Sequence, residues 1–364
     1  MGKLKKIPAN SNGAVLSPLE LILTLAAVAL AVWVALPAWY WHAVKIGTPE
    51  HFRLAYTSRD DYELYSRIVG KLCEKHDVLF LGDSVVWGMY VGNDHTLPAF
   101  LNRELGRDTV ANIAIDGLHP VAMETLVRHY GGAIRGKRVC LYWNPLWMNT
   151  PLYDLTGEGD FSINHPRLLP QFDRSIRSYH PGVRDRCQAT LERLVPFYGW
   201  LHHLRVACFD NGDFKKHLVR HPAENPLAKL HGELSPVETG HGDGRFDWKQ
   251  SGIKAQDWPW VDLAVSRQWR AYLAAARRLR DQGNEVVAVI GTINPHMQTP
   301  ASLARYRALR AAAAAELRRQ GYRIVDLPEL PSQEYADASH PLAGGYRRLA
   351  KFMAEDFRKV PVTK

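Results

Sequence analysis

The sequence is poor in cysteine, and the cysteines it has are scattered. Its four cysteines, at positions 73, 140, 187 and 208, form no Cys-x-x-Cys pair and so carry neither a zinc nor a thioredoxin signature. We therefore predict no metal site, and we expect no cofactor. In an oxidising compartment the pair to test for a disulfide is Cys187 with Cys208, because both lie in one helical segment.

Histidines at metal-ligand spacing are missing as well. His202 and His203 are adjacent, but no carboxylate or third histidine accompanies them at the spacing of a metal site. We expect them to be a solvated or helix-capping pair.

The body of the chain lacks arginine-rich runs with interleaved aromatic residues. This absence argues against nucleic acid as a partner, in spite of a formal net charge of +9. Two interpretations of the positive charge stay open. The surface either meets anionic lipid head groups and acidic envelope polymers, or is merely basic and solvated.

Long hydrophobic runs are confined to one place, Leu21–Trp41. This run contains no charged residue, and about 20 such residues cross the hydrocarbon core of a membrane as a helix. Three lysines lie among the first six residues and an aromatic triplet closes the run, so the positive-inside rule places the N-terminus in the cytoplasm. A cleaved signal peptide would have a shorter apolar core followed by small residues. We therefore expect a single-pass anchor in the cytoplasmic (inner) membrane, with everything after about His42 outside.

The anchor divides the chain into parts. We expect a cytoplasmic N-terminus at residues 1–20, the anchor at 21–41, a linker and first helix at 42–76, and one folded domain at 77–360.

Beyond the anchor, strand-like and helix-like segments alternate. The segment Asp77–Leu81 (DVLFL) is a continuous apolar run, typical of a buried parallel strand. Further strands are predicted at Val110–Ile115, Arg138–Trp143, Glu285–Ile290 and Tyr322–Asp326, and helices at Thr96–Leu105, Val121–Tyr130, Val261–Arg280, Ala301–Gln320 and Gly345–Arg358. This order predicts an α/β fold with about five parallel strands, covered by helices on both faces, and with functional groups at the carboxyl ends of the strands.

Residues 150–260 interrupt the alternation. They are rich in His, Pro, Gly and Trp and contain one amphipathic helical stretch at about Ala189–Val206. We interpret this region as an insertion or cap rather than a second α/β domain.

Two short motifs could carry chemistry. Gly82-Asp83-Ser84 ends the first predicted strand, where α/β sheets hold their ligands, although a serine there could also simply cap a helix. Asp337 and His340 lie three residues apart before the last helix. A serine needs a base to take its proton, and that base needs a carboxylate to fix its tautomer. We predict that Ser84, His340 and Asp337 form such a set.

With these motifs the chain resembles the SGNH hydrolase (GDSL-type esterase) superfamily over about Asp77–Phe357. The resemblance implies a flavodoxin-like three-layer α/β/α sandwich. It also implies that Ser84 is the nucleophile, His340 the general base and Asp337 its orienting acid. The oxyanion hole would use the Ser84 amide, the amide of Gly117 and the side chain of Asn144.

The oxyanion block departs from the family pattern. The family usually has Gly-x-Asn-Asp there, whereas this sequence has Tyr142-Trp143-Asn144-Pro145. Asn144 could instead be a turn residue before proline. Asn294, in a second Asn-Pro turn after the fourth strand, is the reserve donor.

The architecture is most similar to one branch of that superfamily, the membrane-anchored DltD type, which partners membrane-bound O-acyltransferases. This resemblance implies an acyl, such as acetyl, group passed to an envelope or exported polysaccharide. A plain carbohydrate esterase or deacetylase and a non-catalytic assembly partner remain alternatives. Trp87, Trp143 and Trp147 could line an acyl or sugar pocket, although core packing explains them equally well.

Overall fold

The computed structural model describes residues 16–209, 211–212, 214–223, 225, 233–234, 237–238, 248–249 and 254–359. The chain forms two units, Met1–Val44 and Lys45–Lys364.

The first unit is a continuous apolar helix, Pro18–Ala43, which is long and apolar enough to cross a membrane. It consists of α1 (Pro18–Leu30), a π-helical turn η1 (Ala31–Ala35) and α2 (Leu36–Ala43). The turn ends two residues before Pro37, whose ring and missing amide disturb the regular hydrogen bonds of a helix. The helix starts before the predicted run because Ser17 and Glu20 form a capping box there, and it ends at Ala43, beyond Trp41.

The second unit is built on a five-stranded parallel sheet. Its strands are β2 (Val78–Leu81), β3 (Val110–Asn112), β4 (Arg138–Trp143), β6 (Glu285–Ile290) and β7 (Arg323–Asp326). Their order across the sheet is β3-β2-β4-β6-β7, and every neighbouring pair is parallel. The predicted α/β fold with five parallel strands is confirmed. β3 is shorter than predicted, since it ends at Asn112.

The strand order places a switch point between β2 and β4. The chain leaves β2 for one neighbour, β3, and then crosses to the other side to form β4. In open α/β sheets ligands bind where this reversal opens a crevice beyond the carboxyl ends of the strands. The residues that follow Leu81 and Trp143 therefore flank the expected site.

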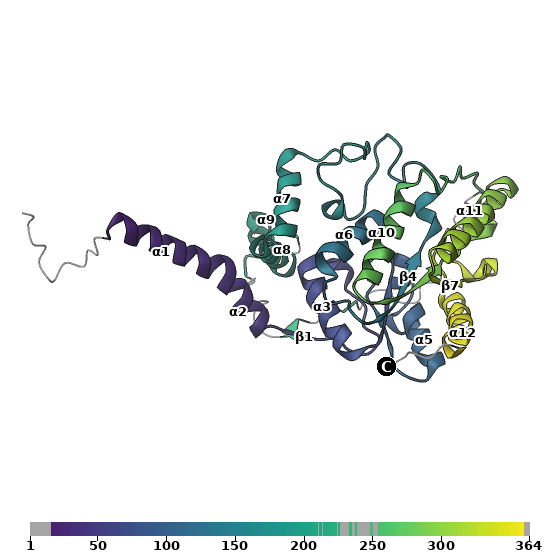
Figure 1. The fold of residues 1–364 in the computed structure, drawn as a ribbon, viewed down its shortest axis with the longest axis horizontal. Helices are drawn as coiled ribbons and strands as arrows, with labels where there is room; N and C mark the ends of the chain where they lie inside the picture. Colours follow the sequence, from purple (N-terminus) through teal and green to yellow (C-terminus); the bar gives the residue numbers. More distant parts are fainter. Residues whose placement is uncertain are drawn as a thin grey trace, which may run out of the picture. The chain divides into compact units, whose positions relative to one another are not determined.

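Helices cover both faces of the sheet, as Figure 1 shows. One layer contains α3 (Tyr62–Lys75), α6 (Pro120–Tyr130), α10 (Arg267–Asp281) and α11 (Pro300–Arg319), and the other contains α5 (Leu97–Leu105) and α12 (Ala343–Lys359). Right-handed crossovers between parallel strands produce this division. α10 starts later than predicted because the hydroxyl of Ser266 caps it by accepting from the amide of Trp269.

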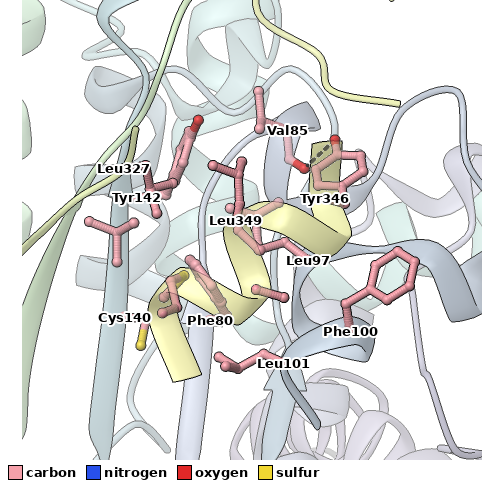
Figure 2. Close-up of a cluster of buried hydrophobic side chains, with 14 of the residues drawn as sticks. Phe80, Val85, Leu97, Phe100, Leu101, Cys140, Tyr142, Leu327, Tyr346 and Leu349 are labelled. Atoms are coloured by element: carbon pink, nitrogen blue, oxygen red, sulfur yellow. Dashed lines mark hydrogen bonds between the residues drawn. The ribbon is translucent and has the colours of Figure 1, made fainter. Parts of the chain in front are cut away.

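The core beneath α5 and α12 supports the first strand and the turn after it. It includes Phe80 and Cys140 from the sheet, Leu97, Phe100 and Leu101 from α5, and Leu349 from α12 (Figure 2). The hydroxyl of Tyr346, in the first turn of α12, donates to the carbonyl of Val85 at 2.7 Å. The last helix therefore holds the segment that directly follows Ser84.

The region 150–260 lacks the alternation of the main sheet and forms three α-helices in its described part. They are α7 (Val183–Leu194), α8 (Pro196–Phe209) and α9 (Phe214–Arg220). The prediction of one helical stretch at Ala189–Val206 was wrong. Pro196 excludes helical backbone at the residue before it, so Val195 is extended and separates two helices.

A second, two-stranded sheet joins the inserted region to the start of the unit. β1 (Lys45–Ile46) pairs in parallel with β5 (Glu233–Leu234). This pairing ties the segment after the N-terminal helix to the chain that follows α9.

One open question and one expectation about the inserted region have an outcome. Cys187 and Cys208, the pair to test for a disulfide, are both thiols, the first exposed and the second buried in α8. The histidine pair is buried rather than solvated, with His203 Nδ1 lying 2.7 Å from Asp61 Oδ2 and His202 Nε2 lying 3.1 Å from the Asp60 carbonyl. The groups that partner them, a backbone carbonyl and a carboxylate, come from a distant segment and gave no local signal.

Candidate active site

The turn after β2 presents Ser84 at the carboxyl edge of the sheet. Asp83 caps the short helix α4 (Ser84–Trp87), its Oδ1 accepting from the amide of Val85 at 3.1 Å. At Gly82 a Cβ atom would lie 2.5 Å from a methyl of Val86 and 2.9 Å from Cβ of Tyr142. Only glycine lets the chain turn this tightly against β4.

The second part of the site is the loop that carries Asp337 and His340. Asp337 Oδ1 accepts from the backbone amides of Ser339 and His340, each at 2.9 Å. Both carboxylate oxygens lie 2.8 Å from His340 Nδ1. The Asp337 carboxylate thus holds the loop together through hydrogen bonds within it and fixes the position of the His340 imidazole.

The structure brings Ser84 and this loop together across 256 residues of sequence, with His340 Nε2 2.8 Å from Ser84 Oγ. A carboxylate only accepts hydrogen bonds, so Nδ1 carries the proton shared with Asp337. In the neutral ring Nε2 is then an acceptor for the serine hydroxyl. The arrangement is that of a nucleophile, a base and an orienting acid.

Nearby carboxylates raise the pKa of His340. Burial alone would lower it, but the charge and hydrogen bond of Asp337 outweigh burial, and Asp83 and Asp116 add to the effect. Burial likewise pushes the pKa of Asp337 upward, yet His340 and the two backbone amides hold it below its ordinary value. Both shifts favour the ion pair that forms when the base takes the serine proton.

The three predicted oxyanion donors are positioned at the ends of neighbouring strands. The Ser84 amide is the first of α4 and has no acceptor within its own helix. Gly117 has a φ of +73°, and its amide makes no backbone hydrogen bond among the described residues. The Nδ2 of Asn144 donates one hydrogen to Asp83 Oδ2 at 2.8 Å, which leaves its second hydrogen available.

Gly117 is also crowded from the inserted region. A Cβ atom there would lie 2.9 Å from Nδ2 of Asn164. The backbone on either side is fixed, because His165 Nε2 lies 2.7 Å from the Asp116 carbonyl and His119 Nε2 lies 3.1 Å from the Asn164 carbonyl. The inserted region therefore forms one wall of the turn that carries this donor.

Asn294 lies beneath the other loop. Its Nδ2 donates to the carbonyl of Asp337 at 3.2 Å and its amide donates to the carbonyl of Ala338 at 2.9 Å. It is fully buried. Its contacts support the loop of the base and acid, which accounts for its position without a role as reserve oxyanion donor.

Asp83 is a site residue for which the sequence analysis predicted no role of its own. Its Oδ2 accepts from Asn144 and from Trp147 Nε1, both at 2.8 Å. Burial raises its pKa, and the hydrogen bonds from Asn144 and Trp147 oppose that rise. One carboxylate thus caps the helix that begins at Ser84 and orients the Asn144 amide, and its position next to Ser84 was the only available signal.

Tyr90 is a second residue that the sequence did not indicate. It has a φ of +67°, uncommon for a residue with a side chain, and its ring meets the His340 ring edge-on at 5.5 Å. Its hydroxyl hydrogen-bonds Asp337, and burial together with this carboxylate raises the pKa of Tyr90. Buried Arg53 holds the loop by donating to the carbonyls of Gly88 and Val91 at 2.7 and 2.8 Å.

The three tryptophans predicted to line a pocket have different positions. Trp87 is 1% exposed, donates to the Leu54 carbonyl and belongs to the core. Trp143 is fully buried and packs edge-on against Trp269. Core packing, the alternative given for these residues, accounts for the positions of both. Trp147 contacts the site through Asp83.

Metal ligands do not gather at this edge of the sheet. Among the described residues, no group of three or more His, Cys, Asp or Glu side chains is placed to hold a metal ion.

Comparison with known proteins adds little to this geometry. No family model matches the chain, and no curated protein matches it. Among solved structures it is similar to a proposed arylesterase from Agrobacterium tumefaciens strain C58, at 12% sequence identity and a TM-score of 0.31. The match covers 79% of this chain and 100% of that one. A likeness this weak carries no argument about activity, so the functional interpretation rests on the site itself.

Proposed function

We propose that the protein is a serine esterase or O-acyltransferase of SGNH type, with Ser84 as nucleophile. The observation that carries this proposal is the continuous line of hydrogen bonds from Ser84 Oγ through His340 to the Asp337 carboxylate. A serine hydroxyl is a weak nucleophile until a neighbouring base takes its proton, and this line supplies the base and its orienting acid.

The chemistry follows from these positions. Ser84 Oγ attacks the carbonyl carbon of an ester while His340 Nε2 accepts the hydroxyl proton. The negative charge that develops on the carbonyl oxygen meets the amides of Ser84 and Gly117 and the second Nδ2 hydrogen of Asn144. His340 then gives its proton to the departing alcohol, and the acyl group stays on Ser84.

The second half of the reaction decides between transfer and hydrolysis. A hydroxyl, from an acceptor or from water, attacks the acyl-serine while His340 takes its proton. We favour transfer to an envelope or exported polysaccharide, because the apolar helix Pro18–Ala43 would hold the site beside a membrane as a retained anchor. A membrane-bound O-acyltransferase would then supply the acyl group.

A fluorophosphonate probe tests the nucleophile without knowledge of the substrate. We expect the full-length protein in detergent to be labelled at Ser84 and the Ser84→Ala variant to be unlabelled. Ser332→Ala is the matched control, because the Ser332 hydroxyl has no hydrogen-bond partner among the described residues and Ser332 lies outside the line from Ser84 to Asp337. A folded wild-type protein that resists the probe would show that Ser84 is not activated.

A second measurement separates transfer from hydrolysis. Purified protein is given an acetyl ester with and without an acetyl-accepting oligosaccharide. Transfer predicts acetylated oligosaccharide and slow release of acetate, whereas a plain esterase releases acetate at the same rate in both mixtures.

A further inference from the structure

The inserted helix α7 exposes its apolar face to solvent and buries part of its polar face. Val183, Cys187, Leu191 and Leu194 follow one another at spacings of four, four and three residues, which puts them on one face of the helix. All four are exposed, and Val183 and Leu194 are 75% and 65% exposed. An amphipathic helix of a globular domain normally buries such a stripe.

The opposite face of α7 shows that this orientation is fixed. The buried residues of α7 are Ala189 and Glu192. The Glu192 carboxylate forms an ion pair with Arg167 and accepts from Gln188 Nε2 at 2.9 Å. The apolar stripe cannot rotate inward without turning Glu192 outward, which would break its contacts and leave Arg167 without its carboxylate.

The stripe continues into a groove between α7 and α8. The groove has a volume of about 460 Å³, and Cys187, Leu191, Tyr198 and Leu201 are among its lining residues. Arg184 and Arg205 also line it. α9 packs against α8 and adds Val219, which is 80% exposed.

Basic side chains accompany the apolar ones on these helices. Lys215, Lys216 and Arg220 are exposed on α9, in addition to the two arginines of the groove. A row of exposed aliphatic side chains with lysine and arginine beside it is the composition of helices that lie in the plane of a membrane surface. A phosphate head group suits the basic residues, and the outer part of an acyl chain suits the aliphatic ones.

Chain connectivity links this surface to the N-terminal helix. Only Val44 separates α2 from β1, and β1 is hydrogen-bonded to β5. β5 follows α9 after residues 221–232. The chain therefore enters the body at the strand that pairs with the segment after the inserted helices.

We propose that Val183, Leu191, Leu194, Leu201 and Val219, with Arg184, Arg205 and the basic residues of α9, form a docking surface for anionic lipids. We call it the α7–α9 surface. Its aliphatic side chains enter the boundary between head groups and acyl chains, and its basic side chains bind lipid phosphates. The proposal rests on the retained anchor of the proposed function, and it gives the body a defined face toward the bilayer.

The exposed thiol of Cys187 provides a probe within the surface. The other three cysteines are buried, so an NBD maleimide should label Cys187 selectively in the full-length protein. The labelled protein is placed in nanodiscs of phosphatidylcholine with and without phosphatidylglycerol. We expect blue-shifted, brighter emission in the anionic nanodiscs, quenched by nitroxide lipids, and emission like that in detergent when anionic lipid is left out.

Charged substitutions then test the surface itself. Leu194→Asp and Val219→Asp should abolish the blue shift, whereas Val265→Asp, at a 60% exposed valine before α10, should leave it unchanged. Emission that is the same in anionic nanodiscs and in detergent overturns the proposal, and a partner protein then becomes the occupant to seek. Failure of the anchor gives a different result, since such a chain would not enter the nanodiscs at all, and fluorophosphonate labelling of Ser84 reports the active site independently.

Discussion

The carboxyl edge of the sheet and the inserted helices break the usual rule of burial in opposite directions. At the edge, the Asp83 carboxylate is buried, the His340 imidazole is 14% exposed, and both are hydrogen-bonded within the body. On α7 and α9, Val183 and Val219 are 75% and 80% exposed. One region hides charge and the other displays apolar surface.

The two regions contribute differently to the free energy of folding. A buried carboxylate loses several kcal/mol of hydration and must be compensated by hydrogen bonds inside the protein. Exposed aliphatic surface adds little to folding but favours association. Substitutions at the edge should therefore change chemistry and stability, and substitutions on the α7–α9 surface should change neither until lipid is present.

The largest effect is expected from substitution of Asp337, the carboxylate that hydrogen-bonds His340. Asp337→Asn keeps the size of the side chain but presents the wrong partner to Nδ1, which disfavours the tautomer that can accept the serine proton. We expect kcat for ester cleavage to fall about 10⁴-fold. Steady-state kinetics on a small acetyl ester measures it, with Asp94→Asn, an exposed aspartate, as control. A loss below tenfold would separate Asp337 from catalysis.

The next effect concerns the oxyanion donor. Asn144→Ala should lower kcat about 10²- to 10³-fold with little change in KM, because the lost hydrogen bond matters only as charge develops. Asp83→Asn should reproduce part of this loss, since Asp83 orients the Asn144 amide. The double variant should be less impaired than the product of the two single losses. Independent, multiplying losses would mean that Asp83 acts by another route.

The third prediction compares the two regions in stability. Asp83→Ala leaves the buried donors of Asn144 and Trp147 without an acceptor, so we expect the free energy of unfolding to fall by about 1 to 3 kcal/mol. Leu194→Asp in detergent should change it by less than about 0.5 kcal/mol. Urea denaturation followed by tryptophan fluorescence measures both. Equal losses, or a more stable Asp83→Ala variant, would contradict the contrast.

The smallest effects are shifts in pH dependence. The base must be neutral to act, and the pKa of His340 is raised, so kcat/KM should fall as pH drops through a value above the ordinary 6.5. Asp116→Asn removes a negative charge that raises this pKa, so the acid limb should move to lower pH. Tyr90→Phe removes a hydrogen bond that stabilises the Asp337 carboxylate, so the limb should move to higher pH.

The two variants serve as controls for each other. A general loss of packing would move both acid limbs in the same direction, whereas the electrostatic argument requires opposite shifts. A pH–rate profile of each variant, measured at constant ionic strength, decides between the two outcomes.

The sheet was predictable because its signals are local. Apolar runs such as VLFL and EVVAVI can hardly be anything but buried strands when glycine or polar residues bound them. The meeting of Ser84 with Asp337 and His340 was predictable too, because the ends of parallel strands lie at one edge. Helix boundaries were less predictable. The apolar pattern indicated that α10 starts at Val261, but the cap at Ser266 makes it start at Arg267.

The residues that the sequence did not indicate act through contacts that have no local pattern. Tyr90 reaches Asp337 and His340 only because Arg53 fixes its loop from 37 positions earlier in the chain. The tryptophans at 87 and 143 gave the same aromatic signal as Trp147, yet only the packing of distant helices separates core from site. The exposure of the apolar face of α7 was not predictable either. A periodic pattern shows which residues share a helix face, but not whether that face points to the core or to solvent.

The order of the site along the chain has a consequence for biosynthesis. Ser84 follows the first strand of the main sheet, whereas Asp337 and His340 follow the last. During synthesis from the N-terminus Ser84 is made long before His340, and a serine without a base is inert toward esters. Under the proposed function, an unfinished or truncated chain would therefore be harmless to the esters around it, and would become reactive only when its final loop docks.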